Sequence, residues 1–190
     1  MKTTRWALIA ALAVASVTGC FRRVEKPAPQ ALGAAAYYPL AVGNRWTYQV
    51  KLLAETSEQT VVIQREERGV FFDSQGGQLS VDAFGINDRR RYLLREPVEA
   101  GRSWTNVVSV SSTERYRILE VATPCEVPAG RFEGCVRVES RNRLNEQTTL
   151  VNEMTLAPGV GIVRIEVAAE TGGRRIPQSE LLLKSYALAH

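Results

Sequence analysis

Histidine is nearly absent from the sequence, because the only one among 190 residues is His190 at the end of the chain. Chain ends fray by default, so we expect no ordered imidazole there. This excludes Ser-His-Asp and Cys-His catalytic arrangements and the two-histidine motif of zinc proteases, and no glycine-rich phosphate loop follows a strand. We therefore expect no enzyme activity, no metal site and no cofactor.

The sequence also lacks a long apolar run and an excess of charge of one sign. The apolar run from Trp6 to Val17 has 12 residues, whereas a membrane-spanning helix needs about 20. Lys2 and Arg5 precede this run, and without them the 24 basic residues fall to 22, against 20 acidic residues. This near-balance argues against a nucleic-acid partner. A composition of 45% hydrophobic and 23% charged residues indicates one globular domain behind a leader.

The leader has the layout of a signal peptide, with basic residues, an apolar core and then small residues. Its end, Val17-Thr18-Gly19-Cys20, resembles the lipobox of bacterial lipoproteins, in which the cysteine thiol accepts a diacylglycerol before cleavage. We predict a lipoprotein signal peptide over residues 1–19 and lipidation of Cys20, which anchors the chain to a membrane. The alternative is an ordinary secretory signal, cleaved near Gly19, that leaves Cys20 as a free thiol.

The residues after the cysteine predict where the domain is held. Retention at the inner membrane usually goes with Asp after the lipidated cysteine, and this chain has Phe21. The resemblance therefore predicts a lipid-anchored protein of the outer membrane that faces the periplasm. Pro27, Pro29 and Gly33 interrupt any regular pattern, so residues 20–36 read as the lipidated cysteine with a flexible tether. A single antiparallel β domain is expected over residues 37–190.

Beyond Tyr37, polar and apolar residues alternate with a period of two, which is typical of strands with one buried face. The predicted strands are Trp46–Leu53, Gln59–Arg68, Gln78–Phe84, Arg90–Arg95, Arg115–Val121, Cys135–Arg141, Glu146–Leu156, Ile162–Val167 and Leu181–Leu188. Turn signals lie at Gly76-Gly77, Asn87-Asp88, Asn142 to Asn145 and Gly172-Gly173. Strands joined by such turns pair as antiparallel hairpins. We therefore predict a mainly β fold, a curved antiparallel meander forming a half-barrel or barrel, after an N-terminal signal helix and tether.

One short motif occurs twice. The segment from Pro39 to Thr47 (PLAVGNRWT) recurs from Pro97 to Thr105 (PVEAGRSWT), with Pro, Gly, Trp and Thr displaced by 58 residues. Each copy predicts a turn that leads into a strand whose early tryptophan fills one end of the core. A duplicated half-domain and two independent strand starts both explain the repeat. We expect Trp46 and Trp104 in the core and not in a ligand site.

Cys125 and Cys135 remain once Cys20 is assigned to the anchor. Export to an oxidising compartment favours their pairing, and Pro128-Ala129-Gly130 predicts a bend between them. We predict a structural disulfide between opposite positions of a hairpin. Unpaired thiols and a redox-active pair are the alternatives, although the spacing is not C-x-x-C and neither lysine nor histidine is adjacent.

Charged residues alternate with apolar ones along the predicted strands. A glycosidase could recruit two carboxylates about 5 to 9.5 Å apart. The candidates are Glu66, Glu67, Asp82, Asp88, Glu114, Glu120, Glu139, Glu153 and Glu166. Arginines that could grip an acidic glycan, a lipid headgroup or a partner protein are Arg89, Arg90, Arg91, Arg95, Arg115, Arg117, Arg137, Arg141 and Arg143. We expect both sets to form a solvated face with cross-strand ion pairs.

Three longer motifs resemble a family of uncharacterised bacterial envelope lipoproteins. They are YYPLAVGNRWTYQV from Tyr37, VPAGRFEGCVRV from Val127 and APGVGIVRIE from Ala157. The resemblance implies a lipid-anchored domain with no catalytic residue to carry over, and it extends in shape to the half-barrels of lipoprotein carriers and receptors. We expect a non-enzymatic binding or scaffolding domain whose partner is an envelope protein or a lipid. The alternative is an acceptor or chaperone for an apolar ligand in the half-barrel, although no amphipathic helix is present to serve as a lid.

Overall fold

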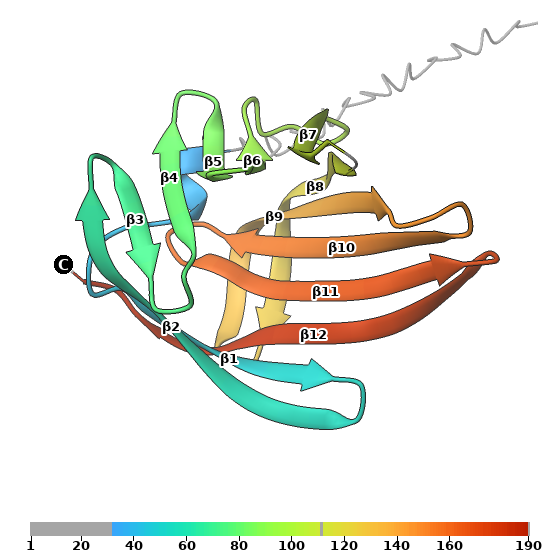
Figure 1. The fold of residues 1–190 in the computed structure, drawn as a ribbon. Helices are drawn as coiled ribbons and strands as arrows, with labels where there is room; N and C mark the ends of the chain where they lie inside the picture. Colours follow the sequence, from blue (N-terminus) through green and yellow to red (C-terminus); the bar gives the residue numbers. More distant parts are fainter. Residues whose placement is uncertain (1–31, 111, 190) are drawn as a thin grey trace, which may run out of the picture.

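The computed structural model describes residues 32–110 and 112–189. Regular structure in these residues is one short 3-10 helix and twelve strands (Figure 1). They are η1 (Ala34–Tyr37), β1 (Arg45–Leu52), β2 (Glu55–Glu67), β3 (Val70–Asp73), β4 (Gln78–Asp82), β5 (Gly85–Asp88), β6 (Arg91–Arg95), β7 (Ser103–Ser109), β8 (Ser112–Val127), β9 (Gly130–Arg143), β10 (Thr148–Ala157), β11 (Gly161–Thr171) and β12 (Arg174–Ala187). The predicted signal peptide, Cys20 and His190 lie outside the described residues.

The twelve strands form one antiparallel sheet in the order β6-β5-β4-β3-β2-β1-β12-β11-β10-β9-β8-β7. Each strand except β6 and β12 therefore pairs with the next one in the chain, and β12 pairs with β1. The two end strands, β6 and β7, come together and make the sheet a nearly closed barrel. The mainly β, antiparallel and barrel-like fold predicted from the sequence is confirmed.

The inward-facing side chains fill the barrel. The most deeply buried residues include Trp46, Ile63, Ile86, Leu94 and Ile118, each between 0% and 1% exposed, and they belong to one continuous cluster. Burial of side chains of this size stabilises the fold by about 1.5–3 kcal/mol each. The alternation seen in the sequence therefore places one face of the strands in a packed core.

Side chains join β6 to β7 where no backbone ladder does. The Asn106 amide accepts from the Tyr92 N–H at 3.1 Å and donates to the Tyr92 carbonyl at 3.2 Å. The Trp104 indole donates to the same carbonyl at 2.9 Å. Arg91 of β6 reaches Glu114 of β8 with two hydrogen bonds of 2.9 and 3.1 Å. Asn106 is 7% exposed. Its side-chain amide makes the two hydrogen bonds to the Tyr92 backbone that a neighbouring strand would otherwise make at the seam between β6 and β7.

The repeated sequence motif forms the same hydrogen-bonded turn in both places. Gly43 donates to the Ile63 carbonyl at 2.9 Å, and Gly101 donates to the Ile118 carbonyl at 2.8 Å. Both glycines have positive φ angles, +93° and +88°. In each case the isoleucine amide donates back to the residue after the glycine, at 2.9 Å. The two copies begin β1 and β7, so each opens one six-strand half of the barrel, as a duplicated half-domain requires.

Both tryptophans of the repeat lie in the core, 0% and 6% exposed for Trp46 and Trp104. Trp46 donates its indole N–H to the Val160 carbonyl in the turn between β10 and β11, at 2.6 Å. A Cβ at Gly161 would lie 2.6 Å from the Tyr38 ring and 3.3 Å from the Trp46 indole nitrogen, and Gly161 has φ +111°. Glycine is therefore the residue that fits beneath this aromatic pair.

The structure corrects several local predictions. Strands β3 and β5 were not predicted, because they are short or mixed in polarity, and β7 was predicted only as a strand start at Trp104. Asn87 and Asp88, predicted as a turn, lie in β5, and the chain turns at Arg89 and Arg90 instead. Ala34, within the range predicted for the tether, is 1% exposed and packs in the core.

Candidate functional site

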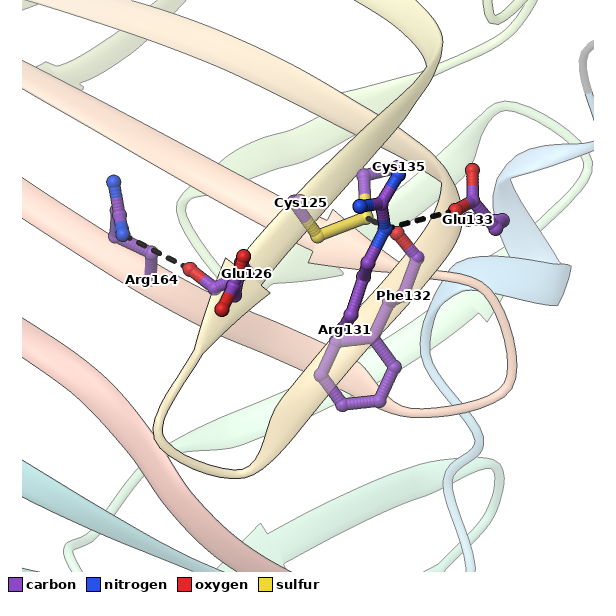
Figure 2. The surroundings of a disulfide bond; sticks show 7 residues. All are labelled: Cys125, Glu126, Arg131, Phe132, Glu133, Cys135 and Arg164. Atoms are coloured by element: carbon purple, nitrogen blue, oxygen red, sulfur yellow. Dashed lines mark hydrogen bonds and ion pairs between the residues drawn. A yellow bond between two sulfur atoms is a disulfide. The ribbon is translucent and has the colours of Figure 1, made fainter.

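Cys125 and Cys135 form a disulfide with Cα atoms 6.1 Å apart, near the end of the β8–β9 hairpin (Figure 2). The predicted placement at directly opposite positions is wrong. Cys135 pairs with Thr123 and Cys125 pairs with Phe132, with a bulge between the two pairs. A bulge shifts the ladder by one residue, and sequence periodicity does not reveal it.

The disulfide holds a hairpin that contacts other strands. The Ala129 N–H, in the hairpin turn, donates to the Leu183 carbonyl of β12 at 2.9 Å. Arg164 of β11 donates to the Glu126 carbonyl at 3.1 Å, as Figure 2 shows. The disulfide therefore has a structural role. It stabilises the end of the β8–β9 hairpin, which contacts β11 and β12.

Four glutamates lie side by side on the outer face of the barrel. In the ladder, Glu139 of β9 is opposite Glu153 of β10, Glu153 is opposite Glu166 of β11, and Glu166 is opposite Glu180 of β12. They alternate with inward residues such as Met154. Opposed Cα atoms in antiparallel sheets are about 4.5–5.5 Å apart, and like charges at such positions destabilise the sheet. We call these four residues the glutamate row.

Arginines neutralise half of the glutamate row. Glu153, which is 8% exposed, accepts from Arg175 at 2.6 Å and from Arg137 at 3.2 Å. Arg141 lies 3.3 Å from Glu139. The hydrogen bond to Glu153 raises the pKa of Arg175 above its ordinary value.

Three members of the row, Glu153, Glu166 and Glu180, border an open groove of about 570 Å³. Its lining includes Glu166 and Glu180, which make no ion pair with any residue in 32–110 or 112–189. Lys51, Arg175 and Gln178 also line it, and we call it the charged groove. It is open to solvent and lies over the bulge where β11 and β12 change register.

The remaining predicted carboxylates do not join this row. Asp82 and Asp88 lie on β4 and β5, and Glu66 and Glu67 end β2. Glu120 of β8 forms an ion pair with Arg137 at 2.5 Å, and Glu114 is 8% exposed inside the barrel. Burial first, and then the charge of Glu114, raise the pKa of Tyr116, which donates to that carboxylate at 2.9 Å. No group of three or more His, Cys, Asp or Glu side chains in the described part of the chain could hold a metal ion. Sequence reasoning missed Glu180, although its alternation with Leu181 on β12 was a usable signal.

Three of the nine predicted arginines, Arg91, Arg137 and Arg141, form ion pairs. The other six make no ion pair with any residue that the structure describes. They are Arg89, Arg90, Arg95, Arg115, Arg117 and Arg143. The prediction of a face balanced by cross-strand ion pairs is therefore right for only part of this set.

Long strands leave part of the inner face uncovered at one end of the barrel. Strands β8 to β12 have 10 to 16 residues, whereas β3 to β6 have 4 or 5. In Figure 1 the β9–β10, β11–β12 and β1–β2 hairpins extend beyond the short strands. Leu52 of β1 and Ile176 of β12, on this inner face, are 55% and 50% exposed. We call this region the open end.

Comparisons with known proteins do not assign a function to this chain. No protein-family model matches the chain, and no curated protein matches it. One similar solved structure is a presumed exported protein with a YmcC-like fold from Bacteroides fragilis NCTC 9343. It has a TM-score of 0.46 and 13% identity, covering 80% of this chain and 99% of that chain. Another is a presumed lipoprotein from Parabacteroides distasonis ATCC 8503, with a TM-score of 0.42, 12% identity and coverages of 80% and 98%.

Among the described residues, no helix has the length and hydropathy needed to cross a bilayer. The lipobox and Cys20 lie outside those residues, so the anchor and the resemblance to envelope lipoproteins stay predictions.

Proposed function

We propose that this chain is a lipid-anchored lipoprotein of the bacterial envelope whose β domain binds or scaffolds a partner and catalyses no reaction. The packed barrel carries the proposal. Its inward side chains form one buried cluster, so contact with a partner falls to the outer surface and to the open end. The leader and Cys20 support the anchor, and Phe21 supports the outer membrane facing the periplasm.

The charged groove is the proposed contact surface. Glu166 and Glu180 face each other there without an ion pair to any described residue, although opposed like charges cost stability. A local cost of this kind is expected where a surface serves binding. The groove can hold polar or charged groups of a partner, because carboxylates and the cations Lys51 and Arg175 border it together.

Metabolic labelling with palmitate tests the anchor. We expect the label in the wild-type protein and none in Cys20→Ala. The double variant Cys125→Ala/Cys135→Ala is the matched control and should keep the label, because it removes only the disulfide cysteines. Label that survives Cys20→Ala would refute the anchor.

A photo-crosslinking amino acid tests the groove. Placed at Gln178, which lines the groove, it should join the protein to one envelope component. The same residue at Glu133, 73% exposed on the β8–β9 hairpin, is the control and should not. The crosslink must also disappear when Glu166→Lys and Glu180→Lys reverse the charge of the groove. A crosslink that is unchanged by this reversal would count against the groove.

An acceptor for an apolar ligand is the second candidate, and only the open end favours it. The core beneath the short strands is filled, whereas Leu52 and Ile176 remain half exposed. If this candidate is right, the double variant Leu52→Asp/Ile176→Asp weakens binding of a fluorescent fatty acid. Val42→Asp, an exposed apolar residue in the turn before β1, should leave that binding unchanged. Equal binding by both variants would end this candidate.

A further inference from the structure

A depression of about 420 Å³ lies on the outer face of the barrel beside the seam between β6 and β7. Arg89 and Arg90, at the turn between β5 and β6, line it together with Arg95 of β6. Tyr92, Thr105 and Val107 form other parts of its wall. We call it the arginine pocket.

One acidic residue, Asp82, lines the pocket itself, and its carboxylate oxygens already have partners. Asp82 accepts from the Phe84 and Gly85 amides through Oδ1, at 2.8 and 3.1 Å. Through Oδ2 it accepts from the Tyr92 hydroxyl at 2.9 Å and from Asn87 at 3.3 Å. Four donors therefore occupy both oxygens of this carboxylate.

The same holds for the acids near Arg91. Asp88 and Glu114 both contact that guanidinium, at 2.8 and 2.9 Å. Neither is thus available to neutralise the other arginines of the pocket.

Three guanidinium groups in the pocket remain open to a ligand. Arg89 and Arg90 are exposed, and neither they nor Arg95 form an ion pair with a residue in the described ranges. The Arg95 guanidinium lies 5.3 Å from the centre of the Tyr92 ring, and both residues line the pocket. Guanidinium groups bind phosphate oxygens through paired, charge-assisted hydrogen bonds. The pocket therefore suits an oxyanion.

The surface around the pocket carries both basic and exposed apolar side chains. Arg115 and Arg117 face outward from β8, and Arg115 is opposite Thr105 in the ladder. Val107, in the pocket wall, is 70% exposed, and Phe84, beside the Gly85 that pairs with Arg95, is 60% exposed. Arginines flanked by exposed apolar side chains are typical of surfaces that lie on an anionic membrane.

The pocket also lies where the chain enters the barrel. Ala34, at the start of η1, donates its N–H to the Glu96 carboxylate at 2.5 Å, and Glu96 follows Arg95 directly. Figure 1 shows β4 to β7 grouped at one side of the barrel with the first described segment among them. Thirteen residues separate Cys20 from Ala34, and such a length spans at most about 45 Å. A chain anchored at Cys20 therefore holds this corner within about 45 Å of the bilayer, so the pocket can reach it.

We propose that the arginine pocket binds the phosphate of anionic phospholipid headgroups and holds this face of the domain against the membrane that carries the anchor. The orientation rests on the proposed function, because it needs the lipid on Cys20, whereas headgroup binding by the pocket can be measured without that lipid.

Vesicle flotation of an anchorless chain, Phe21 to His190, tests the pocket. This chain contains all twelve strands. It should bind vesicles of phosphatidylcholine with phosphatidylglycerol and not vesicles of phosphatidylcholine alone, and added salt should release it. Each arginine near an anionic surface contributes about a fivefold factor in affinity, so Arg89→Gln/Arg90→Gln should weaken binding about 30-fold. Arg95→Gln is a second variant and should weaken it about fivefold.

The matched control is Arg143→Gln/Arg174→Gln. It also removes two positive charges, but from the tips of the β9–β10 and β11–β12 hairpins. If the pocket is the site, this variant should change vesicle binding less than about threefold. Equal losses in both double variants would overturn the proposal, as would binding without preference for the anionic lipid. Saturation of the chain by micromolar inorganic phosphate would also overturn it, since the pocket would then serve a free anion. Failure of palmitate labelling would remove the anchor and leave the vesicle result standing.

Discussion

The seam between β6 and β7 gives a quantitative test of how the barrel closes. In Asn106→Ala the Tyr92 N–H loses its acceptor, and the Tyr92 carbonyl keeps only the bond from Trp104. A lost hydrogen bond costs about 1 kcal/mol, and a buried donor left without a partner costs about 1–3 kcal/mol. Asn106 is 7% exposed, so we expect the free energy of unfolding to fall by about 2–4 kcal/mol.

Urea unfolding with the disulfide intact measures this loss, and hydrogen exchange reports the Tyr92 amide directly. That amide should exchange faster in Asn106→Ala, while amides in the β10–β11 ladder should change only by the global loss of stability. The control is Thr105→Ala, an exposed neighbour on β7, which should stay within about 0.5 kcal/mol of wild type. Equal stability of Asn106→Ala and wild type, with an unchanged Tyr92 amide, would refute the side-chain closure of the barrel.

Three further predictions concern the core, the hairpin and alkaline pH. Gly161→Ala should lower the melting temperature measured by circular dichroism, because its Cβ would lie 2.6 Å from the Tyr38 ring at a φ of +111°; an unchanged value would contradict this contact. Removal of the Cys125–Cys135 disulfide should cost about 3 kcal/mol in urea unfolding, and a cost near zero would show that the hairpin is held without it. Burial raises the pKa of Tyr38 and Tyr116 above 10, so the folded state holds their protons more tightly than the unfolded state. Stability should therefore fall as the pH rises above about 10, and phenolate absorbance from these two residues before unfolding would contradict it.

The sequence predicts the fold better than the register. Clean alternation identified the long strands such as β9 and β11, because one of their faces packs in the core. The short strands β3 and β5 were not predicted, because four residues show too little periodicity and Asn87-Asp88 resembles a turn. The repeated Pro-Gly-Trp motif predicted both strand starts, because it encodes a local turn.

The surface sites show the same limit. Glu139, Glu153 and Glu166 could be placed on strands, but their alignment with Glu180 depends on bulges in β11 and β12 that have no sequence signature. Arg89, Arg90 and Arg95 stood out as a basic cluster, yet the pocket they form exists only because β7 closes against β6. The seam contact of Asn106 had only a weak signal in the sequence, because a polar residue at an inward strand position does not say what it binds. Distant pairing, which the sequence does not encode locally, creates each of these sites.

We propose that Cys20 carries lipid and anchors the packed β barrel to an envelope membrane. Mass spectrometry of the mature protein from fractionated cells tests it most directly. We predict a membrane-associated chain that begins at Cys20 with a diacylglycerol on its thiol and an acylated amino group. A mature chain in the aqueous fraction with an unmodified amino terminus would contradict the account.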